Sequence, residues 1–118
     1  MRKALAILVA AAIPVTFASA AFAAKGDAAK GKAIYVRSCA MCHGAISAGK
    51  PTLPNAADFF KGQFKLTKGA EKEMDKLIKV GGAAYGKGGT AQMPPQPQLS
   101  DKDRADVIAF IKTMKKGK

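Results

Sequence analysis

Large apolar side chains and acidic residues are both scarce in this chain once its first 24 residues are set aside. Residues 25–118 hold only 16 Leu, Ile, Val and Phe among 94 residues, or 17%, and 8 Asp and Glu against 18 Lys and Arg. Chains of this composition lie on the disordered side of the usual boundary for globular proteins, and so short a chain buries a small fraction of its surface. With 118 residues, the sequence has room for one domain at most, which excludes a large multidomain enzyme. The scarcity predicts either a loose chain or a centre filled by something other than amino acids.

The chain also lacks any window in which β-branched and polar residues alternate, so we expect no significant sheet. Helical periodicity appears in three windows: 27–38, 70–80 and 100–114. Asp27 is a suitable N-cap for the first window and Gly81 ends the second. Ser100 and Asp103 form an approximate capping box at the start of the third. A short helical turn is expected within residues 56–60, and the pattern as a whole predicts a small all-α fold.

Two long segments, 44–55 and 81–99, have no helical pattern and are rich in Gly, Pro and small polar residues. Loops this long are uncommon in a compact domain and usually carry function or wrap something. With no internal repeat and no second hydrophobic pattern, we expect one domain over residues 24–118.

The longest apolar run of the chain lies at its N-terminus. Arg2 and Lys3 supply a positive start, residues 4–13 are apolar, and Pro14 breaks the run. Residues 21–23, Ala-Phe-Ala, then offer the small residues that a signal peptidase reads. The apolar run is too short for a span of ~20 residues, and no other stretch is suited to one. We therefore expect residues 1–23 to be a cleaved secretory signal peptide, and the remaining domain to be periplasmic without stable membrane insertion.

Cysteine and histidine are rare, but they are concentrated in one place. The two cysteines and the single histidine of the chain fall within five residues, Cys39-Ala40-Met41-Cys42-His43. A disulfide between the cysteines is one alternative, although the βαβ context of thioredoxin-like proteins is missing. A zinc site is another, although it would need a fourth ligand that the chain does not offer. Two incidental free thiols are a third, and they would be a liability in an exported protein.

Covalent haem attachment explains the same five residues best. C-x-x-C-H at the end of a helix is the signature of c-type haem attachment. Two thiols three residues apart on one helical turn are able to reach the two vinyl groups on one edge of a porphyrin. His43 then lies under the iron as its proximal ligand. We therefore predict one haem c, bound through Cys39 and Cys42.

At this point the chain resembles a class I, monohaem cytochrome c of the bacterial exported type. Residues 31–35, Gly-Lys-Ala-Ile-Tyr, resemble the first helix of that family, in which a glycine lets the last helix approach closely. Val107 and Phe110 match the apolar and aromatic pair of the last helix. The resemblance implies the small cytochrome c fold, with three main helices and a short one around the haem. It also implies that the protein carries electrons and is not an enzyme.

The sixth iron ligand must come from a distant part of the chain, and four methionines are candidates. Met41 lies within the attachment turn on the proximal side, and Met74 and Met114 fall on the apolar stripes of helices, where core packing is the expected role. Met93 lies in an irregular loop before Pro94-Pro95, which favour an extended backbone. Met-Pro in this position also resembles the axial methionine of the family. We therefore predict His43 and Met93 as the two iron ligands, which leaves no open site for substrate chemistry.

The family resemblance implies further contacts around the haem. A proline carbonyl should accept the Nδ1–H of His43, with Pro54 as first choice and Pro51 as the alternative. The glycines at 81–82 and 86–89 should let the backbone pass close to the porphyrin. Candidate propionate contacts are Tyr85, Lys87 and Gln92, and candidate pocket aromatics are Phe59, Phe60 and Phe64.

The strongly basic composition points to acidic partners. Residues 25–118 carry a formal charge of +10, which would steer the protein towards redox partners with acidic docking surfaces, such as an oxidase, reductase or dehydrogenase. No nucleic-acid-binding fold or interleaved Arg and aromatic block is present, so we expect no nucleic-acid partner. The predicted function is a soluble carrier of single electrons; the alternative is a haem c subunit of an exported oxidoreductase complex.

Overall fold

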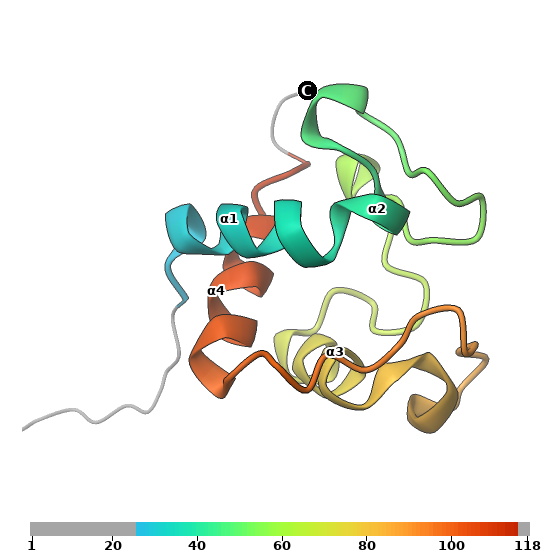
Figure 1. Cartoon of the computed structure of the whole chain (residues 1–118). Helices are drawn as coiled ribbons and strands as arrows, with labels where there is room; N and C mark the ends of the chain where they lie inside the picture. The colour runs from blue at the N-terminus through green and yellow to red at the C-terminus, as the bar shows by residue number, and fades with distance from the viewer. Residues whose placement is uncertain (1–25, 116–118) are drawn as a thin grey trace, which may run out of the picture.

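The computed structural model describes residues 26–115, which fold into four α-helices and two short 3-10 turns (Figure 1). The elements are α1 (Ala28–Ser38), α2 (Ala40–His43), η2 (Ile46–Ala48), η3 (Phe59–Lys61), α3 (Glu71–Tyr85) and α4 (Asp101–Ile111). No strand occurs within these residues, so the predicted all-α class is confirmed. The predicted signal peptide lies outside the described residues. Within residues 26–115, none of the helices has the length and apolar character needed to span a bilayer.

Helices α1 and α4 pack against each other through a glycine. Asp27 caps α1 as predicted, because its carboxylate accepts the N–H groups of Ala29 and Lys30. Gly31 on α1 lies so close to α4 that a Cβ built on it would be 1.9 Å from the Asp106 carbonyl oxygen. Only a residue without a side chain fits there. The glycine expected at the crossing of the first and last helices is therefore confirmed (Figure 1).

A buried carboxylate ties the start of α1 to α4. Asp106 is only 2% exposed. It accepts the backbone N–H of Asp27 at 2.7 Å and pairs with Lys102 at 2.5 Å. Burial by itself would raise the pKa of Asp106, but these donors outweigh it and hold that pKa below its usual value. The carboxylate is therefore ionised at neutral pH and fixes the N-cap residue of α1.

Helix ends follow the predictions in part. The capping box of Ser100 and Asp103 is present at the start of α4. The helix ends at Ile111, however, and not near 114 as predicted; beyond it the Thr113 hydroxyl bonds the Phe110 carbonyl at 2.6 Å and the chain continues in turns. The turn predicted at 56–60 instead starts at 59, because the Asp58 side chain caps it by accepting the Lys61 N–H.

Helix α3 is interrupted at Gly81, as the sequence suggested. This residue has φ 84° and ψ 165°, and one further helical turn, residues 82–85, follows it. The sequence predicted the stop but not the extra turn. Arg104 of α4 is buried and anchors α3 by donating from Nε to Asp75 at 2.7 Å. It also donates from Nη1 to the Leu99 carbonyl and from Nη2 to Asp101.

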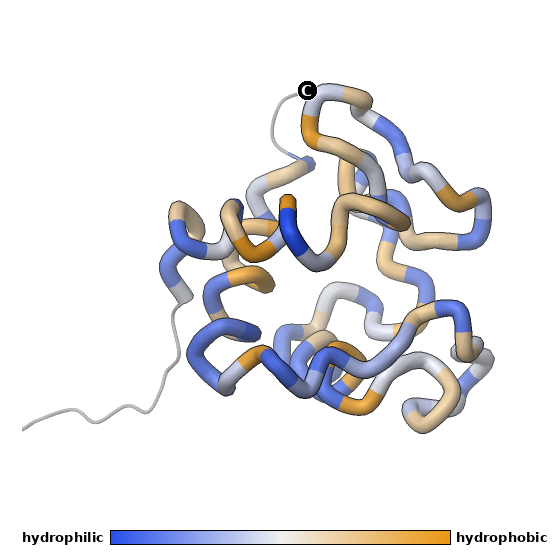
Figure 2. The backbone as a smooth tube through the Cα atoms, viewed as in Figure 1, coloured by the Kyte–Doolittle hydropathy of each residue, from blue (hydrophilic) through white to orange (hydrophobic). Residues whose placement is uncertain are grey.

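The apolar core is small. It consists of nine buried residues from α1, η3, α3, α4 and the loop before α4: Ile34, Tyr35, Phe59, Met74, Ile78, Leu99, Val107, Ile108 and Ile111. Figure 2 shows that apolar segments are short and alternate with hydrophilic ones along the whole chain. In Figure 1, α1 and α2 lie on one side of the molecule and α3 on the other. The space between these two sides contains the site described next.

Candidate functional site

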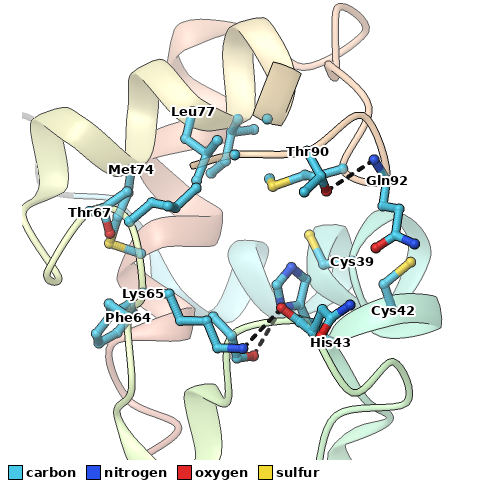
Figure 3. Close-up of a pocket in the computed structure, with 18 of the residues that line it drawn as sticks. Cys39, Cys42, His43, Phe64, Lys65, Thr67, Met74, Leu77, Thr90 and Gln92 are labelled. Atoms are coloured by element: carbon cyan, nitrogen blue, oxygen red, sulfur yellow. Dashed lines mark hydrogen bonds between the residues drawn. The ribbon is translucent and has the colours of Figure 1, made fainter. Parts of the chain in front are cut away.

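A cavity of about 360 Å³ opens between the α1–α2 side of the molecule and α3 with its following loop. Its lining is mostly apolar and includes all four predicted haem-binding residues: the attachment cysteines Cys39 and Cys42, and the predicted iron ligands His43 and Met93. Figure 3 shows Cys39, Cys42 and His43 together on one side, with Thr90, Met74 and Leu77 facing them from across the cavity. The structure therefore brings the sequence motif and the distant methionine to one space.

The attachment turn is a single helical turn at the end of α1. Cys39 ends α1, and its carbonyl accepts the N–H groups of Cys42 at 3.2 Å and His43 at 2.9 Å. Both cysteines are free thiols that line the cavity, so the disulfide alternative is not adopted. Burial, and then the neighbouring Cys42, raise the pKa of Cys39 to about 11. The Cys39 sulfur is thus a neutral group on the wall of an apolar cavity.

A side chain of α1 fixes the end of the attachment turn through a hydrogen bond. Tyr35 is fully buried, and its hydroxyl donates to the carbonyl of Gly44 at 2.7 Å. Burial first, and then Cys39 and Asp58, raise the pKa of Tyr35, so the hydroxyl stays a donor. This bond fixes the residue directly after His43.

The imidazole of His43 is oriented by two residues of one segment. Its Nδ1 lies 3.1 Å from the Ala57 carbonyl oxygen, and its ring stacks on Phe59 with centroids 4.4 Å apart and planes 14° apart. Burial lowers the pKa of His43, although the Ala57 carbonyl opposes this. The ring is therefore neutral near pH 7. With Nδ1–H donating to Ala57, Nε2 has its lone pair available for a metal.

The predicted proline acceptor for His43 is wrong. Neither Pro54 nor Pro51 fills this role, because the Nδ1 partner is Ala57. The N–H groups of Thr52 and Leu53 both bond the Cys42 carbonyl at 3.1 Å, which holds this stretch against the backbone of the turn. The chain reaches the imidazole ring only a few residues later. A backbone carbonyl leaves no side-chain signature, so the sequence could not have pointed to Ala57.

The four candidate methionines separate clearly in the structure. Met93 lines the cavity and is partly buried. Met74 also lines it but is 4% exposed within the core of α3. Met41 is 84% exposed, and Met114 lines a separate hollow. Helix packing for Met74 and a loop position for Met93 both agree with the prediction.

The secondary contacts were predicted less well. Phe59 and Phe64 line the cavity, but Phe60 lines the separate hollow with Met114. Gln92 lines the cavity. Tyr85 and Lys87 do not; both bind Glu73 instead, which lowers the pKa of that carboxyl. Further lining residues that the sequence did not single out are Leu53, Leu66, Thr67, Leu77 and Thr90.

The donor set fits a haem and not a structural zinc ion. Within residues 26–115, no group of three or more His, Cys, Asp or Glu side chains surrounds a common point. Two thiols and an imidazole on one wall, a thioether among the remaining lining residues, and an apolar cavity between match the requirements of a covalently held porphyrin.

Comparison with known families gives the same answer. The sequence model of the family described as cytochrome c matches residues 28–115. The chain belongs to the cytochrome c family. This cytochrome is 33% identical over 90 residues to cytochrome c-554(547) of Halothiobacillus neapolitanus, across 76% of this chain and 99% of that protein. It is 36% identical over 114 residues to cytochrome c6 of a Picosynechococcus species, across 94% of this chain and 92% of that protein. No solved structure matches it significantly.

Family membership establishes the cofactor and the general activity. The cytochrome is of the class I, monohaem type, and its haem c is covalently bound, with Cys39 and Cys42 as the two cysteines of the C-x-x-C-H motif. It is an electron carrier and not an enzyme, and its partners are redox proteins.

Proposed function

We propose that His43 and Met93 are the axial iron ligands of this cytochrome, and that it carries single electrons between exported redox proteins with acidic docking surfaces. The observation that carries the ligand assignment is the shared cavity, because it holds both residues together with the two attachment cysteines. When bound, the haem supplies a group that accepts and releases one electron.

His43 is suited to be the proximal ligand because its orientation is set before any ligand binds. The Ala57 carbonyl fixes the tautomer, and the stacked ring of Phe59 restrains rotation of the imidazole. Donation of the Nδ1–H to the Ala57 carbonyl also raises the basicity of Nε2, which strengthens a bond to a metal.

Met93 is suited to be the distal ligand because it combines access to the cavity with a fixed backbone. Its carbonyl accepts the Gly82 N–H at 2.9 Å and its own N–H donates to the Thr90 carbonyl at 3.3 Å. Imidazole opposite thioether gives a low-spin iron with a raised potential. With His43 and Met93 both bound, the iron would have no open site for a substrate, so the haem would supply electron transfer alone.

The ligand assignment is tested by the weak red absorption band that thioether-bound ferric haem shows. Met93→Ala should abolish the band, and Met41→Ala, which alters a methionine that is 84% exposed, should leave it unchanged. Retention of the band in Met93→Ala would show that another residue binds the iron.

The proposal of an acidic partner rests on the excess of basic side chains over the acidic ones that could pair with them. All eight acidic residues lie within the described part of the chain, and every one caps a helix or pairs with a base: Asp27, Asp58, Glu71, Glu73, Asp75, Asp101, Asp103 and Asp106. Ion pairs among the described residues involve only four bases: Lys87, Lys102, Arg104 and Lys112. Residues 28–57, which include the attachment turn, contain four Lys and Arg and no acid. A segment with this excess of positive charge beside the attachment turn favours a partner with an acidic docking surface.

The docking proposal is tested by ionic strength. The second-order rate of electron transfer to an anionic redox partner should fall steeply between low and physiological salt, because screening shortens the range of attraction. Charge reversal at Lys50, an exposed base near the attachment turn, should reduce the low-salt rate more than the high-salt rate. A rate that is independent of salt would remove this part of the proposal.

Export is proposed from the sequence of residues 1–23. Cleavage after Ala23 would leave a periplasmic domain of residues 24–118. The intact mass of the protein isolated from the periplasm should equal that polypeptide plus one haem. A mass that retains residues 1–23 would contradict the cleavage.

A further inference from the structure

The break in α3 redirects two backbone hydrogen bonds to the segment that carries Met93. In an uninterrupted helix, the Gly82 N–H would donate to the Ile78 carbonyl, four residues earlier. Here Gly81 breaks the helix, and both groups find partners in residues 93–96, which we term the strap. The Gly82 N–H donates to the Met93 carbonyl at 2.9 Å, and the Ile78 carbonyl accepts the Gln96 N–H at 3.0 Å.

Both glycines at the break are needed for this contact. Gly81 has φ 84° and ψ 165°, a region that essentially only glycine occupies. A Cβ on Gly81 would lie 2.7 Å from the Pro95 nitrogen, and one on Gly82 would lie 2.2 Å from the Thr90 carbonyl oxygen. These neighbours are backbone atoms and proline ring atoms, which cannot move aside as a flexible side chain would.

We propose that the Gly81–Gly82 break is a docking notch that positions Met93, and that these two glycines are positioning residues for the distal ligand. The inference rests on the proposed axial role of Met93. The helical hydrogen bond between the Gly82 N–H and the Ile78 carbonyl is absent. Two bonds to the strap replace it, one at Met93 and one at Gln96. The methionine side chain is flexible and unbranched, so the precision of its sulfur position depends on the backbone that bears it.

The notch predicts which perturbations release the ligand. Because both clamping bonds join backbone groups, changing the side chain of Gln96 leaves them intact. A side chain at position 81 instead pushes the strap off α3, and one at position 82 displaces Thr90, whose carbonyl accepts the Met93 N–H. The sixth iron position then opens part of the time, and small external ligands compete for it.

The primary test compares Gly81→Ala with Gly86→Ala in the haem-loaded protein. Gly86, unlike Gly88 and Gly89, does not line the cavity. It has φ 79° and ψ −155°, so alanine there suffers a similar backbone strain, but no atom lies within 4 Å of its Cβ position. Gly81→Ala should raise the affinity of the ferric protein for imidazole by about tenfold or more and weaken the red absorption band. Gly86→Ala should stay within about twofold of wild type. Equal shifts in the two variants would overturn the proposal.

A second measurement on the wild-type protein covers the case in which the variants do not fold. In the reduced protein, the amide hydrogens of Gly82 and Gln96 should exchange slowly and together, since one opening of the strap exposes both. Fast exchange of either amide under native conditions would overturn the notch. If both are protected but wild type lacks the red band, the notch stands and the axial assignment of Met93 fails instead.

Discussion

His43, the proposed proximal ligand, is oriented by two residues of one short segment. Ala57 supplies the carbonyl that accepts Nδ1–H, and Phe59 supplies the ring on which the imidazole stacks. Between them, Asp58 fixes the segment by capping the turn that follows, with its carboxylate on the Lys61 N–H at 3.1 Å. The orientation of the imidazole is therefore set by residues that never touch the iron.

Phe59→Leu should alter the imidazole without removing it. Loss of the stacked ring frees the imidazole of His43 to rotate about its Cβ–Cγ bond. The g-values of the ferric protein should therefore broaden or shift in electron paramagnetic resonance. Stability should fall by about 1–2 kcal/mol because the ring is buried. Phe60→Leu is the control, since Phe60 lies outside the cavity. Identical g-values in both variants would exclude a role for stacking.

Asp106→Asn should cost stability in a way that depends on pH. The pKa of Asp106 is held below its usual value, so its contribution is fully present above the unfolded pKa of ~3.9 and is lost as the pH falls through the folded value. The variant should be less stable by about 1 kcal/mol at pH 7, and the difference should shrink below pH ~4. Chemical denaturation at both pH values measures this. A difference that does not change with pH would mean that the carboxylate charge is not involved.

At the scale of elements, the helix crossing depends on one missing side chain. Gly31→Ala would place a methyl group 1.9 Å from the Asp106 carbonyl oxygen, a backbone atom in the middle of α4. Since α4 cannot yield locally, α1 and α4 must separate, and stability should fall by about 2–4 kcal/mol. Gly49→Ala is the control, because nothing lies within 4 Å of its Cβ position, and it should cost only the strain of its positive φ. Equal losses in the two variants would contradict the close crossing.

Elements with local signals were predictable from the sequence, and those set by tertiary contacts were not. The caps at Asp27 and Ser100 and the stop at Gly81 are encoded within a few residues, and all three occur. The acceptor for His43 was assigned wrongly because a backbone carbonyl can come from any residue. The helix end at Ile111 was placed too late because the apolar pattern continues to Met114 although the backbone does not.

The candidate site divides in the same way. Cys39, Cys42 and His43 are adjacent in sequence, so the motif alone located them, and Met93 followed from its proline neighbours. Two other contacts, the Tyr35 bond to Gly44 and the bond of the strap to Gly82, were not predictable. No sequence pattern indicates that these pairs of segments meet. Sequence patterns can predict candidate ligands, whereas the contacts that orient those residues depend on how distant segments meet.

At the scale of the whole molecule, the small core and the large cavity belong together. Only nine residues of the described part of the chain form the buried core, and four of them, Phe59, Met74, Ile78 and Ile111, line a cavity of about 360 Å³. Burying an apolar disc at ~25 cal/mol per Å² supplies stabilisation that so few side chains cannot. We therefore expect the haem to stabilise the fold as well as to carry the electron.

The haem-free chain should be largely unfolded. A Cys39→Ala, Cys42→Ala variant expressed without residues 1–23 should show little helix in far-ultraviolet circular dichroism, because the cavity lining would be exposed to water. The loaded wild-type protein, measured at the same concentration, is the reference. A native helical spectrum without haem would show that the polypeptide folds unaided.

The axial role of Met93 is tested most directly by proton nuclear magnetic resonance of the reduced, haem-loaded protein. A methionine bound to the iron lies over the porphyrin, so ring current moves its methyl signal far upfield. We predict one such signal, assigned to Met93 by its loss in Met93→Leu, with the signal of Met74 in the ordinary range for a buried methyl. Assignment of the upfield signal to Met74, or its absence, would contradict the account.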